Sequence, residues 1–573
     1  MTPILDQPQT IDTDQLAVGV RYRLANQELF FHTDAATDLV DLEWPWAGER
    51  YARSIVLRIS ALREDELAPL VTRFYPAYQE VILGNESTIV SKRVCALLNS
   101  SYDRSILWAL ECQAEGDRLL RLEIEIDWGQ PLTQRIVDGL LVAQRNPQPA
   151  RGIYEQSNAE STCVFGNPYG RPDGIEIDDP ERAKLVYHVL VNGAVEVPLL
   201  LTISDVGEQI AWNGFLALRD TERAFELSVR AWTELLKSGR LWTPATDFNQ
   251  AVQAGKIQAA RRIQRLRSGF APSDRDLRHL PALVESLDVF DLTASRNLLA
   301  HARRLAEQCE GRLPGQFAAH GHEQSDDPGL ALIETNTAYI MALYEHLRRH
   351  FDAELLNEHY TAVRLCADAL IQHRWQAQLD EDGPALAVVG AALRRALGMA
   401  MQHLDSVNVV RWESEACEME RKAEMLATSV DPPQFDGPAA FAQSGWQMTD
   451  NAPWFFADPW QGVALAGAAV WRGVGISWEH ERLTVYPTWP AEWTWWALLD
   501  LPLKTGKLSL LWDGTTLYAT QPVESQLPVK VVQRITAQKT EEHEFDLQFE
   551  LKVEAEGQVQ RQLFKPQFLS VAR

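Results

Sequence analysis

Cysteine is scarce in this sequence and follows no pattern. The six cysteines are scattered over 573 residues, with no C-x-x-C pair and no regular framework. Such spacing fits neither a structural zinc site nor a small domain held together by disulfides. We therefore expect reduced thiols buried in the protein core.

Basic charge and apolar runs are also limited. The chain has 54 Lys and Arg against 79 Asp and Glu, a formal net charge of −25. Because nucleic-acid binding needs clustered Lys and Arg, we expect no nucleic-acid partner. The start has no basic segment followed by an apolar one, which predicts a cytoplasmic protein. The longest weakly polar run, 385–401, is interrupted by Arg394 and Arg395, so we expect a buried helix and no membrane span.

Motifs for cofactors and metals are missing too. The sequence contains no P-loop, no G-x-S-x-G and no G-x-G-x-x-G with the proper flanks, so no cofactor is expected. His320 and His322 could ligate a metal, but spacing supplies no third ligand. His346 and His350 lie four residues apart, yet Leu347 stands where H-E-x-x-H has its glutamate. We interpret these two histidines as surface residues.

The first 205 residues have the pattern of an antiparallel β-sandwich. Residues 121–128 alternate polar and apolar, which places Leu122, Ile124, Ile126 and Trp128 on one face of a sheet. In 186–197 the dipeptide Asn192-Gly193 predicts a type I′ hairpin turn. Similar runs elsewhere in this part indicate many strands at hairpin spacing.

From residue 221 the apolar period becomes helical. Phe225, Val229, Trp232 and Leu236 recur at helical spacing, with Asp220 or Thr221 as N-cap and Gly239 after the end. This predicts a linker of one helix within 206–245. A second helix is expected over 247–267, with its Arg and Lys on the outer face, followed by helical stretches at 276–291, 294–309, 330–348, 352–374, 384–404, 409–427 and 459–471.

The end of the chain changes composition. Ten of the 19 tryptophans lie between positions 446 and 512, and strand-like alternation returns, as in 508–512. We therefore divide the chain into a β-sandwich at 1–205, a linker at 206–245, a helical-hairpin barrel at 246–472 and a β-domain at 473–573.

Three passages in this order carry a resemblance to a known family. Trp232 to Pro244 resembles a segment that precedes the first barrel helix, and Arg275-Asp276 resembles a sugar-binding aromatic-x-Arg-Asp turn. The stretch 473–493 resembles the exit from the barrel. Together they look like the six-hairpin glycosidase superfamily, in its glycogen-debranching and glucoamylase-like branch. The resemblance implies a multidomain α+β protein with an N-terminal antiparallel β-sandwich, a central (α/α)6-type barrel and a C-terminal β-domain.

The sequence also departs from that pattern. Ser273 stands where the family has an aromatic residue, and 335–339 lacks the aspartate that opens a later inner helix. The stretch 428–472 is short for the last hairpins. We therefore expect a shortened or degenerate member whose barrel is incomplete.

The turn at 274–276 is the predicted substrate-binding site. The resemblance implies that Arg275 and Asp276 bind the deepest sugar, and Asp274 adds a carboxylate at the same helix start. A purely structural alternative exists, in which Ser273 or Asp274 caps the helix and Arg275 pairs with a carboxylate.

Glu381 and Asp382 are the predicted catalytic residues. The resemblance places the general acid in this acidic turn, and clustered like charges raise a carboxyl pKa. A solvated acidic turn at a helix start is the alternative. The catalytic base has no firm counterpart; the candidates are Asp450, Asp458 and Glu479.

The predicted function is inverting hydrolysis, inside the cell, of an α-glucan or a related oligosaccharide or polysaccharide. Inversion needs one protonated carboxyl and one ionised carboxyl that activates water. The alternative is a non-catalytic member of the same fold that binds carbohydrate or protein. A lyase or epimerase is a third possibility, with His279 as the nearby base.

Overall fold

A computed structural model describes most of the chain, in two compact units. One unit is formed by residues 2–234 and the other by 235–447 and 455–573. The sequence-based boundaries at 205, 245 and 472 stay predictions. The described residues are 9–12, 22–44, 49–61, 67–145, 161–205, 207–266, 269–316, 328–350, 352–377, 382–426, 459–479, 482–485, 489, 493–504, 506–512, 517–520, 529–536, 539–545, 552–553 and 559–560.

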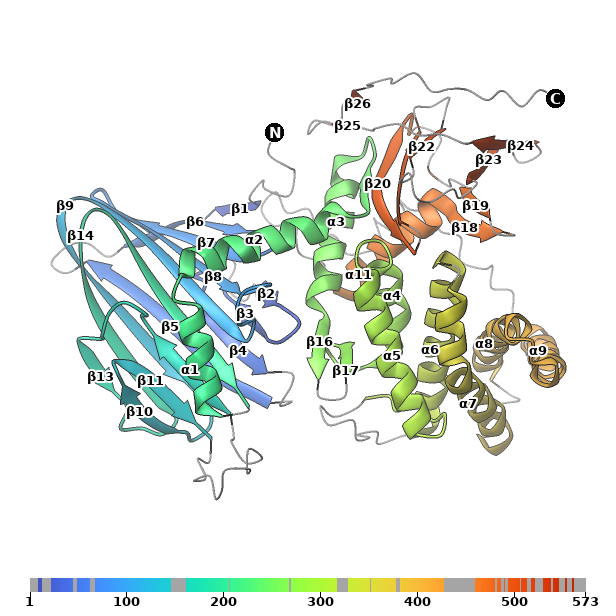
Figure 1. The fold of residues 1–573 in the computed structure, drawn as a ribbon, viewed down its shortest axis with the longest axis horizontal. Helices are drawn as coiled ribbons and strands as arrows, with labels where there is room; N and C mark the ends of the chain where they lie inside the picture. The colour runs from blue at the N-terminus through green and yellow to red at the C-terminus, as the bar shows by residue number, and fades with distance from the viewer. Residues whose placement is uncertain are drawn as a thin grey trace. The chain divides into compact units, whose positions relative to one another are not determined.

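The first unit is built on two long strands. β9 (Ser105–Asp127) and β14 (Arg182–Ser204) pair antiparallel along most of their length (Figure 1). β8 (Thr88–Ala96) pairs with the first half of β9, and β5 (Glu49–Ala61) pairs with the second half. The sheet therefore branches at β9. The other strands are β1 (Gln9–Asp12), β2 (Tyr22–Ala25), β3 (Phe30–Thr33), β4 (Leu39–Trp44), β6 (Ala68–Phe74), β7 (Tyr78–Gly84), β10 (Thr133–Val137), β11 (Leu140–Gln144), β12 (Thr162–Gly166) and β13 (Gly174–Glu176).

The two branches pack face to face. The rings of Tyr22 in β2 and Phe74 in β6 lie 4.7 Å apart, and the buried Lys92 of β8 donates to the carbonyl of Leu57 in β5 at 3.1 Å. The predicted inward face is confirmed, since Leu122, Ile124, Ile126 and Trp128 are all buried. The expected antiparallel β-sandwich is therefore present.

The predicted hairpin turn at Asn192-Gly193 is wrong. β14 continues through it, with a register shift between Val191, opposite Arg118, and Gly193, opposite Ala114. Gly193 has a φ of 78°. The positive φ that suits a type I′ turn also suits a β-bulge, and periodicity alone does not separate the two.

Two helices follow the sandwich, where the sequence predicted one. α1 (Glu208–Ala217) precedes α2 (Thr221–Lys237). Of the two candidate N-caps, Asp220 accepts the N–H of Arg223 at 3.1 Å. Gly239 has the expected left-handed conformation, with a φ of 61°.

Helical hairpins form most of the second unit, close to the predicted positions. α4 and α5, α6 and α7, and α8 and α9 are consecutive pairs; α4 packs on α6 and α6 on α8, while α5 packs on α7 (Figure 1). This is an (α/α) arrangement in two layers. The helices are α3 (Thr246–Arg261), α4 (Leu280–Leu287), α5 (Leu292–Gln308), α6 (Pro328–His350), α7 (Ala353–Ala377), α8 (Gly383–Gln402), α9 (Ser406–Leu426) and α11 (Pro459–Ala468).

Helices α4 and α6 run in the same direction. Arg278, in the 3₁₀ turn that precedes α4, contacts Glu334 near the start of α6, while Asp288 at the end of α4 contacts His346 near the end of α6. α8 also packs on α6, where Gly398 lies against the ring of Tyr344, each in the last turns of its helix.

Helix α11 joins the same parallel set. Trp460, at its start, stacks on His279 just before α4, and Gly467, at its end, lies against Glu285. The N-terminal ends of α4, α6 and α11 therefore point to one end of this layer, and their C-terminal ends point to the other.

The prediction that the helix over 247–267 carries its Arg and Lys on an outer face is wrong. α3 ends at Arg261, and a hairpin follows, formed by β16 (Ile263–Leu266) and β17 (Gly269–Pro272). Lys256 and Arg261 are fully buried. The amine of Lys256 donates to the carbonyls of Leu236 at 3.0 Å and Ser238 at 2.6 Å, and burial lowers its pKa.

Among the described residues, α8 is the one helix long and apolar enough, by length and composition, to cross a membrane. It packs against α6, α7 and α9, and ten of its residues are buried. Its apolar composition is accounted for by this packing, as the sequence predicted for 385–401.

Small sheets form the C-terminal part of the second unit. β15 (Arg240–Trp242) pairs with β20 (Trp496–Leu503), which continues to β21 (Gly506–Trp512) and β22 (Leu517–Thr520). The strand predicted at 508–512 is thus confirmed. The remaining strands are β18 (Ile476–Glu479), β19 (Arg482–Val485), β23 (Val529–Thr536), β24 (Lys539–Phe545), β25 (Lys552–Val553) and β26 (Val559–Gln560).

Replacing Gly239 tests how tightly the end of α2 packs. A Cβ at this position would overlap the carbonyl oxygen of Val289, and the backbone of Gly239 also has a left-handed φ that side chains disfavour. We expect Gly239→Ala to lower the free energy of unfolding by more than ~2 kcal/mol, measured by chemical denaturation.

Gly193→Ala is the matched control. Its φ is also positive, but a Cβ there meets nothing within 4 Å. We expect a loss of only ~1 kcal/mol, the conformational term alone. Equal losses in the two variants would contradict the close packing at Gly239.

Candidate functional site

The β16–β17 hairpin positions the turn at 273–276. The N–H of Ser273 donates to the carbonyl of Arg262 at 2.8 Å, which continues the hairpin pairing. Arg275 then adopts a left-handed backbone with a φ of 58°. This conformation costs a non-glycine residue about 1–2 kcal/mol. Strained residues of this kind concentrate at functional sites, so the turn is a candidate.

Asp276 is the anchor of the turn. Its side chain is 5% exposed and accepts the N–H of Arg278 at 2.9 Å, so it caps the 3₁₀ turn before α4. The guanidinium Nε of Arg278 lies 2.9 and 2.8 Å from the two carboxylate oxygens. The same guanidinium binds Glu334 of α6 at 3.1 Å. Arg278 thereby connects the turn to the next parallel helix.

Asp274 lies beside an aromatic pair. Its carboxylate is 3.4 Å from Nε2 of His279, and the His279 ring stacks on Trp460 with centroids 4.1 Å apart and planes 8° apart. The guanidinium of Arg262 lies 4.9 Å from the Trp460 ring. Flat rings with carboxylates and guanidinium groups nearby suit the apolar faces and hydroxyl edges of a sugar.

The pKa of Asp274 is raised above its ordinary 3.8. Partial burial is the largest cause, and the nearby charge of Asp276 adds to it, whereas His279 acts in the opposite direction. The residue is nevertheless exposed on the surface. A carboxyl group that binds its proton more tightly than usual and reaches solvent is a candidate proton donor.

The cap of the turn differs from the one that the structural alternative predicted. The N-cap is Asp276, not Ser273 or Asp274. The Arg278 side chain pairs with Asp276, and Arg275 is half-buried. Sugar binding by Arg275, Asp276 and Asp274 stays a prediction.

Sequence reasoning missed Arg278, Glu334 and Trp460. Trp460 was visible only as one member of the tryptophan-rich segment. Arg278 lies two residues after Asp276. This spacing indicates a capping residue with a charged partner only if the 3₁₀ turn is already known. Nothing local marks Glu334, because its partner is 56 residues away.

The predicted catalytic turn is described in part. Asp382 caps α8 by accepting the N–H of Ala385 at 3.0 Å, and it is exposed. Glu381, Asp450 and Asp458 fall outside the described residues, and so does the side chain of Glu479.

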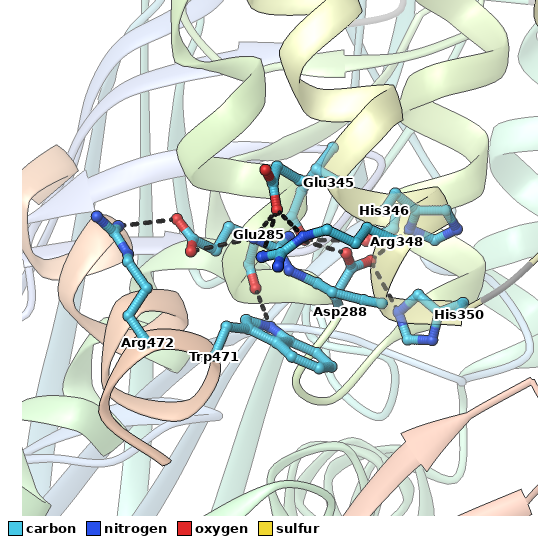
Figure 2. A network of polar contacts seen from close by, with 11 residues as sticks. Glu285, Asp288, Glu345, His346, Arg348, His350, Trp471 and Arg472 are labelled. Carbon is cyan, nitrogen blue, oxygen red and sulfur yellow. Dashed lines mark hydrogen bonds and ion pairs between the residues drawn. The ribbon is translucent and has the colours of Figure 1, made fainter. Parts of the chain in front are cut away.

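The surface interpretation of His346 and His350 is wrong. Both are buried, 0% and 4% exposed, at the opposite end of the same helices, together with Asp288 at 0%. Asp288 Oδ1 lies 2.7 Å from Nδ1 of His346 and 3.7 Å from Nε2 of His350 (Figure 2). Burial alone would raise the pKa of Asp288, but the neighbouring His346 and His350 lower it well below its ordinary value. Burial lowers the pKa of His350 to about 4.

A chain of ion pairs extends this cluster. Arg349 binds Asp288 Oδ2 at 3.3 Å and Glu285 at 3.1 Å, and Arg472 binds the other oxygen of Glu285 at 3.1 Å. Trp471 donates its indole N–H to the Glu285 carbonyl at 2.9 Å. Arg472 and Trp471 belong to a π-helical segment, Ala469–Gly475. Such segments are rare and often mark functional sites.

Comparison with known proteins bears on the fold. No family model and no curated protein matches the sequence. Among solved structures, a putative kojibiose phosphorylase from the human microbiome matches with a TM-score of 0.59 at 9% identity, over 91% of this chain and 94% of that one. A GH78 rhamnosidase of Bacillus sp. GL1 matches with a TM-score of 0.38 at 9% identity, over 78% and 54%. A GH92 α-mannosidase from Bacteroides thetaiotaomicron matches with 0.39 at 12%, over 69% and 61%.

These likenesses concern architecture. The first structure shares the fold of this chain from the N-terminal sandwich to the C-terminal sheets. The resemblance to the six-hairpin glycosidase superfamily is thereby confirmed at the level of the fold. So is the expected multidomain α+β class, with a β-sandwich, an (α/α) helical part and C-terminal sheets.

The raised pKa of Asp274 has a consequence for stability. The folded carboxyl binds its proton more tightly than the unfolded one, so its contribution is largest below the ordinary Asp pKa and disappears as pH rises through the folded pKa. We expect the difference in unfolding free energy between wild type and Asp274→Asn to fall as pH rises above about 4. Urea denaturation at a series of pH values measures it, and a difference that grows with pH would refute the raised pKa.

Proposed function

We propose that this protein cleaves the glycosidic bond of an oligosaccharide, an α-glucan or a related sugar. The observation that supports this is the gathering of Asp274, Arg278, Trp460 and Glu334 at one end of a parallel helix layer, within a fold shared with a putative kojibiose phosphorylase. The groups come from separate segments, as a binding site requires.

The proposed chemistry is inversion by two carboxyl groups. One protonates the leaving oxygen, and the other activates the attacking water from the opposite face of the sugar. Asp274 fits the protonated member among the described residues, because its pKa is raised and its side chain reaches solvent. Glu381 or Asp382 stays the sequence-based candidate for the second carboxyl group.

Phosphate is the second acceptor to consider. A phosphorylase transfers the sugar to phosphate instead of water, and the N-terminal ends of α4, α6 and α11 create a positive potential that favours an anion. The solved structure that shares the fold is that of a putative phosphorylase. Assays therefore need both acceptors.

The catalytic assignment is tested with kojibiose and maltooligosaccharides, with and without inorganic phosphate. We expect Asp274→Asn, and the double variant Glu381→Gln with Asp382→Asn, each to reduce kcat/KM at least ~100-fold, the usual effect of removing an acid or base. Product is measured by chromatography, and circular dichroism checks folding.

Asp117→Asn is the matched control. Asp117 is an exposed carboxylate of β9 that binds Asn192, in the sandwich unit. Its replacement should leave turnover unchanged. Full activity in the double variant would remove Glu381 and Asp382 from the mechanism, and full activity in Asp274→Asn would remove Asp274.

A non-catalytic carbohydrate-binding role is the second candidate. It is favoured because the carboxylate oxygens of Asp276 already accept hydrogen bonds from the Arg278 backbone N–H and guanidinium group. The side chains of Thr335 and Asn336 are also engaged within the protein. They donate hydrogen bonds to the carbonyls of Leu313 at 2.8 Å and Gly311 at 2.6 Å, respectively. Calorimetry beside the turnover assay separates the two functions, since saturable binding without product in either acceptor would support binding alone.

A further inference from the structure

The buried cluster at the C-terminal ends of α4 and α6 has the composition of a metal site. His346 and His350 are four residues apart on α6, so both imidazoles project from one face of the helix. Asp288 immediately follows the last residue of α4. Figure 2 shows the Asp288 carboxylate directed toward the two rings.

The donor atoms converge. One nitrogen or oxygen from each of the three side chains lies within 4.8 Å of the other two. Asp288 Oδ1 is 2.7 Å from His346 Nδ1 and 3.7 Å from His350 Nε2. Two ligands of a tetrahedral zinc ion, bound at about 2.0–2.1 Å, lie roughly 3.4 Å apart. The observed distances bracket that value.

The histidines have unused donor positions. Among the described residues, Nε2 of His346 and both ring nitrogens of His350 have no hydrogen-bond partner, although all three atoms are buried. The 3.7 Å separation from Asp288 is too long for a hydrogen bond. Buried polar atoms are normally paired, and a metal ion bound at Nε2 of His350 would supply the partner that this nitrogen lacks.

Surrounding residues orient the carboxylate as they do around metals. Arg349 binds Oδ2 of Asp288 and is itself fixed by Glu285, which leaves Oδ1 directed toward the histidines. The Trp471 ring packs edge-on against His350, with centroids 5.7 Å apart. Such outer contacts fix the orientation of metal ligands.

We propose that Asp288, His346 and His350 bind a divalent transition-metal ion, with zinc as the best fit to two imidazoles and one carboxylate. The ion would join the ends of α4 and α6. A metal-free alternative, in which a protonated His346 pairs with Asp288, leaves the nitrogens of His350 without partners.

The test is metal uptake by the full chain, purified without a histidine tag and stripped with a chelator. We expect one equivalent of Zn²⁺ per chain by elemental analysis, a visible ligand-field spectrum with Co²⁺, and a higher thermal midpoint with Zn²⁺. His350→Gln and His346→Gln should each weaken Zn²⁺ binding at least ~10-fold, measured by competition with a chromogenic chelator.

His359→Gln is the matched control. His359 is also fully buried, and its Nδ1 lies 2.9 Å from the hydroxyl of Tyr339 on α6. This variant should keep wild-type affinity. The proposal is overturned if the wild type takes up neither Zn²⁺ nor Co²⁺, or if His350→Gln binds as tightly as the wild type. These readouts do not depend on sugar cleavage, so they fail or succeed separately from the proposed function.

Discussion

Unpaired backbone groups at helix ends constrain the helical unit of this protein. Every helix starts with N–H groups and ends with carbonyls that its own hydrogen bonds leave unused. Three parallel helices, α4, α6 and α11, bring these groups together, so one end of the layer is electropositive and the other electronegative. The side chains follow this polarity: Asp276 caps the 3₁₀ turn at the first end, and Arg349, His346 and His350 lie at the second.

The two ends differ in access to solvent, and this separates their chemistry. At the N-terminal end Arg278 is 48% exposed and Glu334 43%, so a ligand can reach them. At the C-terminal end Asp288 and His346 are fully buried. Turnover is therefore expected at the first end, and a static ion at the second.

Sequence patterns located the elements well and the polar side chains poorly. Helix positions followed from apolar periodicity, since burial of one helix face depends on local spacing. Lys256, predicted to face outward, is buried because carbonyls at 236 and 238 accept its amine, some 20 residues away. His346 and His350 were misassigned for the same reason: their partner, Asp288, is 58 residues distant from His346.

The site was predictable to the extent that its groups are adjacent in sequence. Asp274 to Asp276 stood out as charged residues at a helix start, and the turn was found. The bond from Arg278 to Glu334 and the stack of His279 on Trp460 join segments 56 and 181 residues apart, which no local motif encodes. A fold determines which helix ends lie together, but not which side chains those ends carry. The fold can therefore be shared at 9% identity while the chemistry at the helix ends differs. The function of this chain must therefore be read from the residues at its own helix ends.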